Sequence, residues 1–389
     1  MSMKCIRIGF GKIAQIHEEH LRKQGVHTIG VVEIDPKRIQ AIELAGFKAF
    51  NSLAEAIKQQ PDFYDICTPV YARADTLGVL CALDPYANIL IEKPICDFKD
   101  WAQVSQILSA HKGRVAVNEN YASSNVTLAV KHELTKRGIE PNRLIIESTK
   151  NRVPDFLSGR FIDSQLGALG YECSHLLALV QEMGAGYALE ALLESDIDSI
   201  ENITKHLDNT DSLPMINQNG AFMQYRAKNG CTVDLYSSMT GTLGFACLPY
   251  AQPGEKIKPD DVQTRYRILR VDGVDASGIA HQVVGFFEPI HGLERSQSML
   301  FVFKNWVLEH TSAPFEDNTM SQHLLRVKQY FAGGNTNPYD YERALSDVKS
   351  LHDWAQTCWH AMDDSNDVLG CEETANARHE DAKRFSQKA

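Results

Sequence analysis

The strongest constraint on the fold is a regular alternation of two sequence patterns between residues 1 and 121. Short apolar runs, such as 5–10 and 88–94, have the length and composition of buried strands. The segments between them, such as 11–23 and 36–46, carry apolar residues at helical spacing. Strands that alternate with helices of this length predict a doubly wound parallel sheet, and hence an α/β fold.

Beyond Tyr121 the pattern changes. A helical segment at 126–138 leads into longer and more polar strand patterns, at 143–153, 220–241, 264–273 and 298–312. The Asn229-Gly230 pair between two strand patterns is a strong signal for a hairpin turn. Alternation with one polar face predicts a large, mostly antiparallel sheet that is open on one side, within an α+β domain.

The C-terminal region shows a further pattern. Apolar residues at helical spacing predict a long amphipathic helix over 341–362, which we expect to pack back on the first domain. Residues 363–389 contain few large apolar side chains, which is typical of a mobile polar tail. A chain of 389 residues is long enough for two domains, and we predict them at 1–121 and 122–362.

Charge and cysteine usage limit the partners and the compartment. The formal net charge of -11 argues against a nucleic-acid partner and against binding to an anionic membrane. No apolar run approaches the ~20 residues that a bilayer span needs. The first ten residues lack the apolar core and cleavage site of a secretory signal. The nine cysteines include no Cys-x-x-Cys pair, which favours a reduced, cytoplasmic protein.

A glycine-rich turn lies between the first predicted strand and the first predicted helix. It reads Gly9, Phe10, Gly11, Lys12, Ile13, Ala14. The first glycine allows a tight turn, the second lets the backbone approach a pyrophosphate, and the alanine keeps helix and strand close. Free N–H groups at the start of the helix can bind the phosphates. The motif therefore predicts dinucleotide binding, with an ordinary strand–helix turn as the alternative.

Glu33 ends the second strand pattern, about 20 residues after the glycines. A carboxylate at this position accepts hydrogen bonds from ribose hydroxyls and repels a 2′-phosphate. It favours NAD over NADP, although Lys37 and Arg38 are close enough in sequence to accommodate that phosphate. Asp35 either assists Glu33 or begins the turn that follows.

Two further segments end strand patterns at the same edge of the predicted sheet. Thr68 and Pro69 end the fourth strand, and Glu92, Lys93 and Pro94 end the fifth. Ligands of open parallel sheets bind beyond the carboxyl ends of the strands, so we expect both segments to face the cofactor. Pro94 restricts Lys93 to extended geometry. The Lys93 ammonium can then stabilise a substrate hydroxyl oxygen as it becomes an alkoxide; a structural Glu–Lys pair is the alternative.

In their order and spacing, residues 9–14, 68–69 and 92–94 resemble the Gfo/Idh/MocA oxidoreductases, which include glucose–fructose oxidoreductase and inositol dehydrogenases. Residues 117–121 are similar to the segment where that family passes from its nucleotide domain to its sheet domain. Residues 166–179 resemble its helix with a catalytic histidine. The resemblance implies a Rossmann domain, an α+β domain that forms homodimers or homotetramers through its open sheet, and hydride transfer involving a secondary alcohol.

The resemblance also implies roles for individual residues. Lys93 corresponds to the family lysine, and His175 to the histidine that takes the hydroxyl proton. Tyr171 and Ala178 stand where the family usually has aspartates, and Arg73 where it usually has a histidine. Tyr171 can orient the reacting pair by hydrogen bonding, but it supplies no anion at neutral pH without a large pKa shift.

These arguments together predict two sets of contacts. The cofactor contacts are Gly9, Gly11, Lys12, Ile13, Ala14, Glu33, Asp35, Thr68, Pro69, Arg73, Glu92, Lys93 and Asn120. The substrate contacts are Lys93, Arg152, Arg160, Asp163, Tyr171, Glu172 and His175. The two arginines in the second set can hold a phosphate or carboxylate, or else are ordinary solvent-facing charges.

The expected activity is NAD-dependent hydride transfer at a secondary alcohol of a sugar, amino sugar, nucleotide sugar or cyclitol. Two alternatives remain open: transient oxidation that drives elimination or hydrolysis without net redox change, and a non-catalytic dinucleotide-binding sensor. We expect no catalytic metal. His17 and His20 lack the spacing of zinc proteases, and Cys173 and His175 lie two residues apart, which does not suit a helical metal site.

Overall fold

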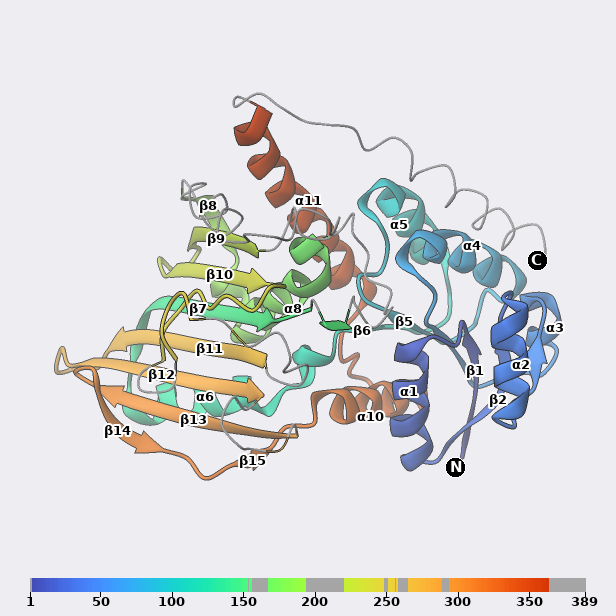
Figure 1. Ribbon diagram of the computed structural model, residues 1–389, viewed down its shortest axis with the longest axis horizontal. Helices are drawn as coiled ribbons and strands as arrows, with labels where there is room; N and C mark the ends of the chain where they lie inside the picture. Colours follow the sequence, from blue (N-terminus) through green and yellow to red (C-terminus); the bar gives the residue numbers. More distant parts are fainter. Residues whose placement is uncertain are drawn as a thin grey trace. The chain divides into compact units, whose positions relative to one another are not determined.

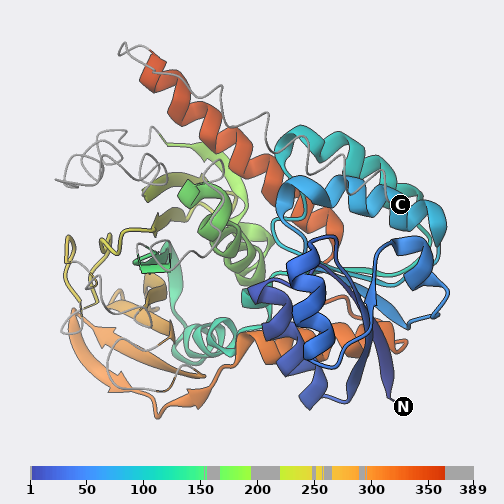
Figure 2. The same cartoon turned by 45° about the vertical axis from the view of Figure 1, so that its right-hand side comes forward.

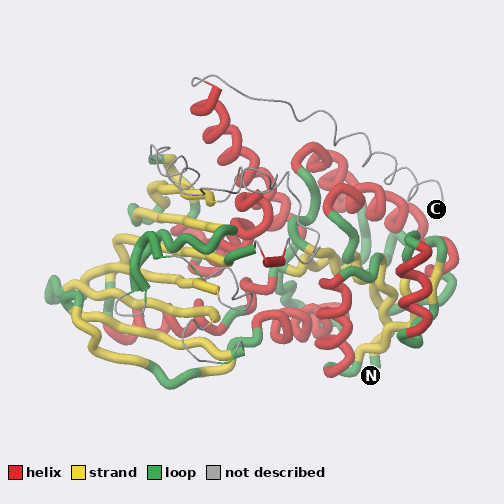
Figure 3. Tube along the Cα trace, in the orientation of Figure 1, coloured by secondary structure: helices red, strands yellow, loops and turns green. Residues whose placement is uncertain are grey.

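The computed structural model describes residues 2–152, 154–155, 167–193, 220–247, 251–255, 257, 265–288, 294 and 296–363. The chain divides into two compact units. The first comprises Met1–Asn120, Met320–Asp353 and Met362–Ala389, and the second Tyr121–Thr319 and Trp354–Ala361. Each unit is built around its own sheet (Figures 1 and 3).

The sheet of the first unit has six parallel strands in the order β3-β2-β1-β4-β5-β6. Their bounds are Met3–Ile8 (β1), Val26–Val32 (β2), Ala49–Phe50 (β3), Phe63–Ile66 (β4), Ile89–Glu92 (β5) and Val115–Asn118 (β6). The order reverses between β1 and β4, which gives a doubly wound sheet and confirms the predicted fold class. Such a reversal creates the crevice in which these sheets bind their ligands.

Helices connect these strands. They are α1 (Lys12–Lys23), α2 (Pro36–Leu44), α3 (Leu53–Ile57), η1 (Val70–Ala72), α4 (Arg73–Leu83), η2 (Phe98–Asp100) and α5 (Trp101–Ala110). The local sequence explains where they begin. Asp35 caps α2 by accepting the N–H of Lys37, with Pro36 at the first helical position, and Ser52 caps α3 by accepting the N–H of Glu55.

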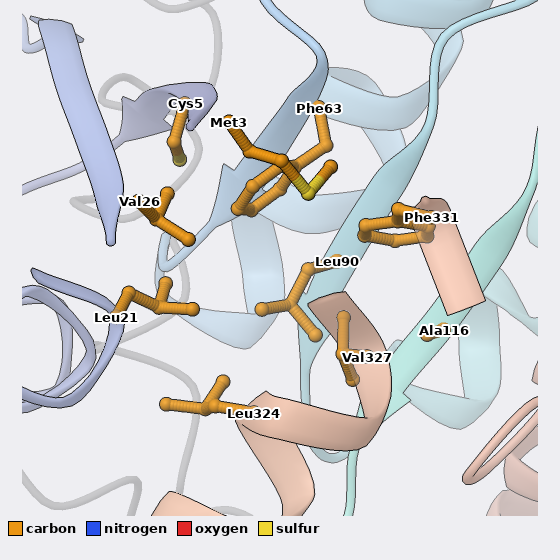
Figure 4. Close-up of a cluster of buried hydrophobic side chains, with 10 residues drawn as sticks. All are labelled: Met3, Cys5, Leu21, Val26, Phe63, Leu90, Ala116, Leu324, Val327 and Phe331. Carbon is orange, nitrogen blue, oxygen red and sulfur yellow. The ribbon is translucent and has the colours of Figure 1, made fainter. Parts of the chain in front are cut away.

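Two C-terminal helices follow, α10 (Thr319–Phe331) and α11 (Tyr341–Asp363). The chain returns to the first unit over Met320–Asp353, whereas Trp354–Ala361 of α11 belongs to the second unit. Leu324, Val327 and Phe331 of α10 are buried against apolar side chains of β1, β2, β4, β5 and β6 (Figure 4). The indole N–H of Trp101 donates to the carbonyl of Leu345 in α11. The sequence patterns did not predict α10, which covers one face of the parallel sheet.

The second unit contains a mixed sheet in the order β14-β13-β12-β11-β7-β10-β9-β8, with β15 paired to β13. In this described sheet β7 and β10 are parallel, and the other neighbouring strands are antiparallel. The strands are Glu140–Lys150 (β7), Leu189–Leu192 (β8), Gly220–Ala227 (β9), Thr232–Ser238 (β10), Arg265–Val274 (β11), Ala280–Glu288 (β12), Gln297–Lys304 (β13), Val307–Thr311 (β14) and Phe315–Glu316 (β15). The predicted hairpin at Asn229-Gly230 is confirmed, and Gly230 has the positive φ that this turn requires.

Two helices, α6 (Asn125–Arg137) and α8 (Gly167–Met183), cover one face of this sheet (Figure 2). Short helices η3 (Asn120–Ser123) and η4 (Ala185–Tyr187) flank them. Gly285 makes room for α6, because a Cβ there would lie 2.3 Å from Val126.

The residues that precede and follow Gly285 point to the opposite face, since side chains alternate along a strand. On that face, Leu243, Cys247, Ala251 and Ile257 join a buried cluster with Tyr266, Phe286 and Phe301. The chain's own segment therefore covers part of the face that was expected to be open. None of the helices in the described part of the chain combines the length and apolar content needed to cross a bilayer.

Candidate active site

The glycine turn joins β1 to α1. Gly9 has a φ of 85°, and a Cβ there would lie 3.3 Å from the carbonyl oxygen of Cys67, so a side chain would be strained and crowded. Gly11 caps α1 without a side-chain hydrogen bond, and a Cβ added to it would meet nothing within 4 Å. The backbone at Gly11 is therefore open on the side where a Cβ would lie, and it begins a helix whose first N–H groups can bind a pyrophosphate.

Glu33 follows β2 beside this turn and is only 4% exposed. Its carboxylate accepts backbone N–H groups from Phe10 (3.2 Å), Ile34 (2.9 Å) and Asp35 (3.2 Å). Arg38 lies 3.8 Å from the same carboxylate and 3.6 Å from that of Asp35. Glu33 is thus fixed next to the glycine turn, where the sequence placed the ribose contact, whereas Asp35 caps α2.

Arg73, at the start of α4, is buried and connects the ends of two strands. Its Nε donates to the carbonyl of Thr68 (3.0 Å), and its Nη1 donates to the carbonyls of Glu92 (2.8 Å) and Pro94. The hydroxyl oxygen of Thr68 is buried and has no hydrogen-bond partner among the residues that the structure describes. An orphaned hydroxyl at this edge fits a site that a cofactor completes.

Lys93 follows directly after β5 and is half-buried, with a cis peptide bond to Pro94. The preceding carboxylate, that of Glu92, is turned into the protein. Its Oε1 lies 2.9 Å from Nε2 of His17 and also accepts the side-chain N–H of Asn118. The sequence predicts that Glu92 contacts the cofactor. Its carboxylate instead binds His17 of α1 and Asn118 of β6.

His17 is completely buried on α1. Its Nδ1 lies 3.0 Å and 3.1 Å from the two carboxylate oxygens of Asp65, which also accepts the Nε of Arg7 at 3.1 Å. Burial alone lowers the pKa of His17, but the charge of Asp65 leads the effects that together raise it well above its usual value.

His17, Asp65 and Cys67 also offer three potential metal ligands within 4.8 Å of one another. Metal binding requires a ring nitrogen with a free lone pair, whereas both nitrogens of His17 face carboxylate oxygens. Burial is the largest effect on Cys67 and raises the pKa of its thiol to about 12, which disfavours the thiolate form that metals bind. These contacts favour an ion-pair network over a metal centre.

In the second unit, His175 lies on α8 and is 8% exposed. Its ring packs against that of Tyr121, with the ring centroids 4.7 Å apart. Arg267, on β11, lies over the same tyrosine ring and donates to its hydroxyl. The histidine is therefore held by an aromatic contact that is itself fixed by a buried arginine.

Glu172, one residue before Cys173 on the same helix, has no exposed surface. Its carboxylate accepts hydrogen bonds from Arg152, from Arg267 (2.9 Å) and from the hydroxyl of Ser148 (3.2 Å). We therefore assign Glu172 to holding two guanidinium groups in place, rather than to direct contact with a substrate.

Asp155 lies between two cations next to this network. It accepts hydrogen bonds from Lys150 (2.7 Å) and from Arg152 (3.0 Å). Burial, followed by the charge of Arg152, lowers the pKa of Lys150 to about 8. Arg152 is thus buried and paired, in contrast to a solvent-facing charge.

Other predicted residues are placed as follows. At the start of α1, Lys12 is exposed, Ile13 is half-buried and Ala14 is fully buried. Pro69 precedes η1, and Asn120 begins η3. Tyr171 belongs to α8, but its side chain, like Arg160 and Asp163, lies outside the described residues. The roles assigned to all these residues stay predictions.

Sequence reasoning missed four side chains that support the site: Ser148, Lys150, Arg267 and Asn118. It considered His17 only as a metal ligand. Ser148, Lys150 and Arg267 lie in strand patterns, where period-two alternation could have placed them on one face. The pairing of Ser148 and Arg267 with Glu172 of α8, and that of Lys150 with Asp155, are contacts that no local pattern signals.

The family model described as "Oxidoreductase family, NAD-binding Rossmann fold" (GFO_IDH_MocA) matches residues 3–119. No protein of curated function matches the sequence. Several solved structures share the fold, each at low identity. One is UDP-N-acetylglucosamine 3-dehydrogenase GnnA from Acidithiobacillus ferrooxidans, at 14% identity and a TM-score of 0.61, which covers 91% of this chain and 96% of that chain.

Two further structures contain a bound cofactor. GenD2 from gentamicin A biosynthesis, in complex with NAD, has 15% identity and a TM-score of 0.64 over 92% of this chain and 94% of that chain. An oxidoreductase from Agrobacterium radiobacter, in complex with NAD+, L-tartaric acid and magnesium, has 18% identity and a TM-score of 0.61 over 92% and 97%. Residues 3–119 thus match the NAD-binding Rossmann domain of the Gfo/Idh/MocA oxidoreductases, and the solved structures share the fold of the chain.

Proposed function

We propose that this protein is an NAD-dependent dehydrogenase that oxidises a secondary alcohol of a sugar, amino sugar, nucleotide sugar or cyclitol, or reduces the corresponding ketone. The observation that carries the proposal is the position of Lys93. In a unit that matches an NAD-binding oxidoreductase family, this half-buried ammonium directly follows β5 at the carboxyl edge of the sheet, where ligands of such sheets bind.

When bound, the nicotinamide supplies the hydride acceptor. The chain's part is to hold the alcohol and to move its proton. The Lys93 ammonium binds the hydroxyl oxygen and stabilises the negative charge that develops on it. Arg73 fixes the backbone on both sides of Lys93 through the carbonyls of Glu92 and Pro94, so that the ammonium needs little reorganisation.

His175 takes the hydroxyl proton in this proposal. An unprotonated imidazole nitrogen can accept a proton from an alcohol as a general base. The contact with Tyr121 limits the rotation of the ring. Tyr171 orients the reacting pair by hydrogen bonding, in place of the aspartate that is usual at this position.

The substrate class draws support from two proteins of the same fold. One is named as a dehydrogenase of UDP-N-acetylglucosamine, and another as an enzyme of gentamicin A biosynthesis. We therefore place sugars, amino sugars and nucleotide sugars first among the compounds to test, followed by inositols.

The test is a screen for NADH formation with free and phosphorylated sugars, amino sugars, nucleotide sugars and inositols. A positive compound is then assayed with Lys93→Met, which should lose turnover while it retains NAD affinity, and with Lys99→Met as a solvent-exposed control that should keep both. NADH released into solution identifies net oxidation, whereas NADH that stays bound and is consumed identifies transient oxidation. Near-normal turnover by Lys93→Met would contradict the role of the lysine.

A further inference from the structure

Resting on the proposed role of Lys93, we propose that His17 is a positioning residue: it binds Glu92 from beneath the sheet edge as an imidazolium and thereby fixes the turn that carries the catalytic lysine. His17 lies on the helix that begins at the glycine turn, whereas Glu92 immediately precedes Lys93. The buried imidazole therefore connects α1, the helix that begins at the glycine turn, to the turn that carries Lys93.

The proton count supports a charged ring. Nδ1 of His17 lies 3.0 Å from Oδ1 of Asp65, and Nε2 lies 2.9 Å from Oε1 of Glu92. A neutral imidazole has one N–H group, so its other nitrogen would direct a lone pair at a carboxylate oxygen. The side-chain nitrogen of Asn118 also lies 2.9 Å from Nε2, but it donates to Glu92 Oε1 as well. The contacts of His17 with both carboxylates are hydrogen bonds only when both ring nitrogens carry a proton.

The charges around the ring require this cation. Arg7 on β1 and His17 on α1 alternate with Asp65 on β4 and Glu92 on β5, and all four side chains are at least nine-tenths buried. Among the residues that the structure describes, the other groups at the ring are the Cys67 thiol and the Asn118 amide, which are neutral. Arg7 also binds Glu18, so without the imidazolium Asp65 would share its remaining cation with another carboxylate. Glu92 would lose the cation that contacts its carboxylate, and an uncompensated buried charge is strongly destabilising.

The turn is therefore held through two kinds of contact. Arg73 binds the backbone carbonyls of Glu92 and Pro94, and His17 binds the carboxylate of Glu92. Asn118 on β6 donates to the same carboxylate. Fixing a residue on each side of Lys93 limits the positions open to its ammonium, and a catalytic group displaced by about 1 Å can lose a factor of ~100 in rate.

The charge state is tested without any substrate. Protein labelled with ¹⁵N-histidine should show one ring with both nitrogens protonated at pH 8. The signal should be lost in His17→Gln and kept in His20→Gln, the matched control on the same helix. A neutral tautomer for His17 at pH 8 would overturn the proposal. Because this measurement needs no turnover, it remains decisive even if no polyol reduces NAD.

Whether His17 holds the turn that carries Lys93 can also be tested without a substrate. The rate of reductive methylation of Lys93, followed by mass spectrometry, should rise severalfold in His17→Gln and stay unchanged in His20→Gln, because a released turn exposes its amine more often. Identical methylation rates in wild type and His17→Gln would show that the imidazole does not hold the turn.

With an active substrate, His17→Gln should lower kcat by about 100-fold while the Kd for NAD stays within about twofold of wild type. If His17 acts through Glu92, the His17→Gln/Glu92→Gln double variant should be no slower than the slower single variant. Additive losses, or a fall in NAD affinity equal to the fall in rate, would indicate a structural role only. A wild type that oxidises no polyol would contradict the proposed function and leave the two substrate-free results to decide the role of His17.

Discussion

The carboxylate of Glu147 accepts the backbone N–H of Phe245 at 2.8 Å and that of Gly244 at 3.0 Å, on the face of the second sheet opposite α8. Thr149 also donates to it. The side chain is completely desolvated, and this burial outweighs the three donors and raises the pKa of Glu147 from about 4.5 to about 8. One buried carboxyl thus attaches the backbone of Gly244 and Phe245 to the sheet.

The raised pKa of Glu147 predicts that stability falls as pH rises. Between about pH 4.5 and 8 the folded state keeps a proton that the unfolded state has lost. The apparent Tm should therefore decrease over this window, and Glu147→Gln, which stays neutral at every pH, should reduce the decrease. Glu140→Gln on the exposed end of the same strand is the control. A Tm slope that is the same for Glu147→Gln and wild type would contradict the assignment.

His323 predicts the opposite pH dependence for the first unit. Its Nε2 donates to the carbonyl of Val117 at 2.8 Å, and burial lowers the pKa of His323 to about 4. Between about pH 6.5 and 4 the unfolded state binds a proton that the folded state excludes, so stability should fall as pH decreases.

Urea titrations at pH 7 and pH 5 measure this effect. His323→Gln should lose less stability on acidification than wild type, whereas His310→Gln, an exposed histidine of β14, should behave like wild type. An equal loss in His323→Gln and wild type would show that another group accounts for the acid sensitivity.

Local signals made much of the first unit predictable. Asp35, Pro36 and Ser52 mark helix starts in the sequence, and apolar runs bounded by such signals can be recognised one at a time. The packing of α10 had no such signal, because its burial depends on Leu324 meeting strands that lie some 200 to 300 residues earlier in the chain. Only the folded chain brings such partners together.

In the candidate site, too, some features have a local sequence signal and others depend on tertiary contacts. Gly9 and Glu33 could be predicted because their spacing follows from the geometry of a strand–helix–strand unit. The direction of the Glu92 carboxylate could not, because its partners come from α1 and β6. The position of Glu92 at the end of a strand can be predicted from the sequence. The orientation of its carboxylate depends on charged and polar groups that only the folded chain brings near it.

Arg73 should be sensitive even to conservative replacement. Its guanidinium donates from two nitrogens to the carbonyls of Thr68, Glu92 and Pro94, and a lysine cannot match that geometry. Arg73→Lys should leave buried carbonyls unsatisfied and cost about 1–3 kcal/mol of unfolding free energy. Arg73→Lys should also lower the turnover rate, because the turn that carries Lys93 loses the hydrogen bonds from the guanidinium to the carbonyls of Glu92 and Pro94. Urea denaturation with Lys99→Arg as a surface control measures the loss, and unchanged stability would contradict this account.

Glu33 should determine the preference for NAD over NADP. Three backbone N–H groups orient its carboxylate, and Arg38 lies 3.8 Å away. Removing the carboxylate in Glu33→Ala takes away a hydrogen-bond acceptor for the ribose and the charge that repels a 2′-phosphate. Arg38 then keeps only its 3.6 Å contact with Asp35 and can bind that phosphate.

The Kd values for NAD and NADP, measured by fluorescence titration, check this prediction. In Glu33→Ala the Kd for NAD should rise by about tenfold, the value of one good hydrogen bond to a charged group, and the Kd for NADP should fall. The double variant Glu33→Ala/Arg38→Ala should lose the gain for NADP but not regain NAD affinity, because only the arginine supplies the phosphate contact. Equal changes for both cofactors in Glu33→Ala would mean that the carboxylate supports the glycine turn, through its bond to Phe10, and does not discriminate at the ribose.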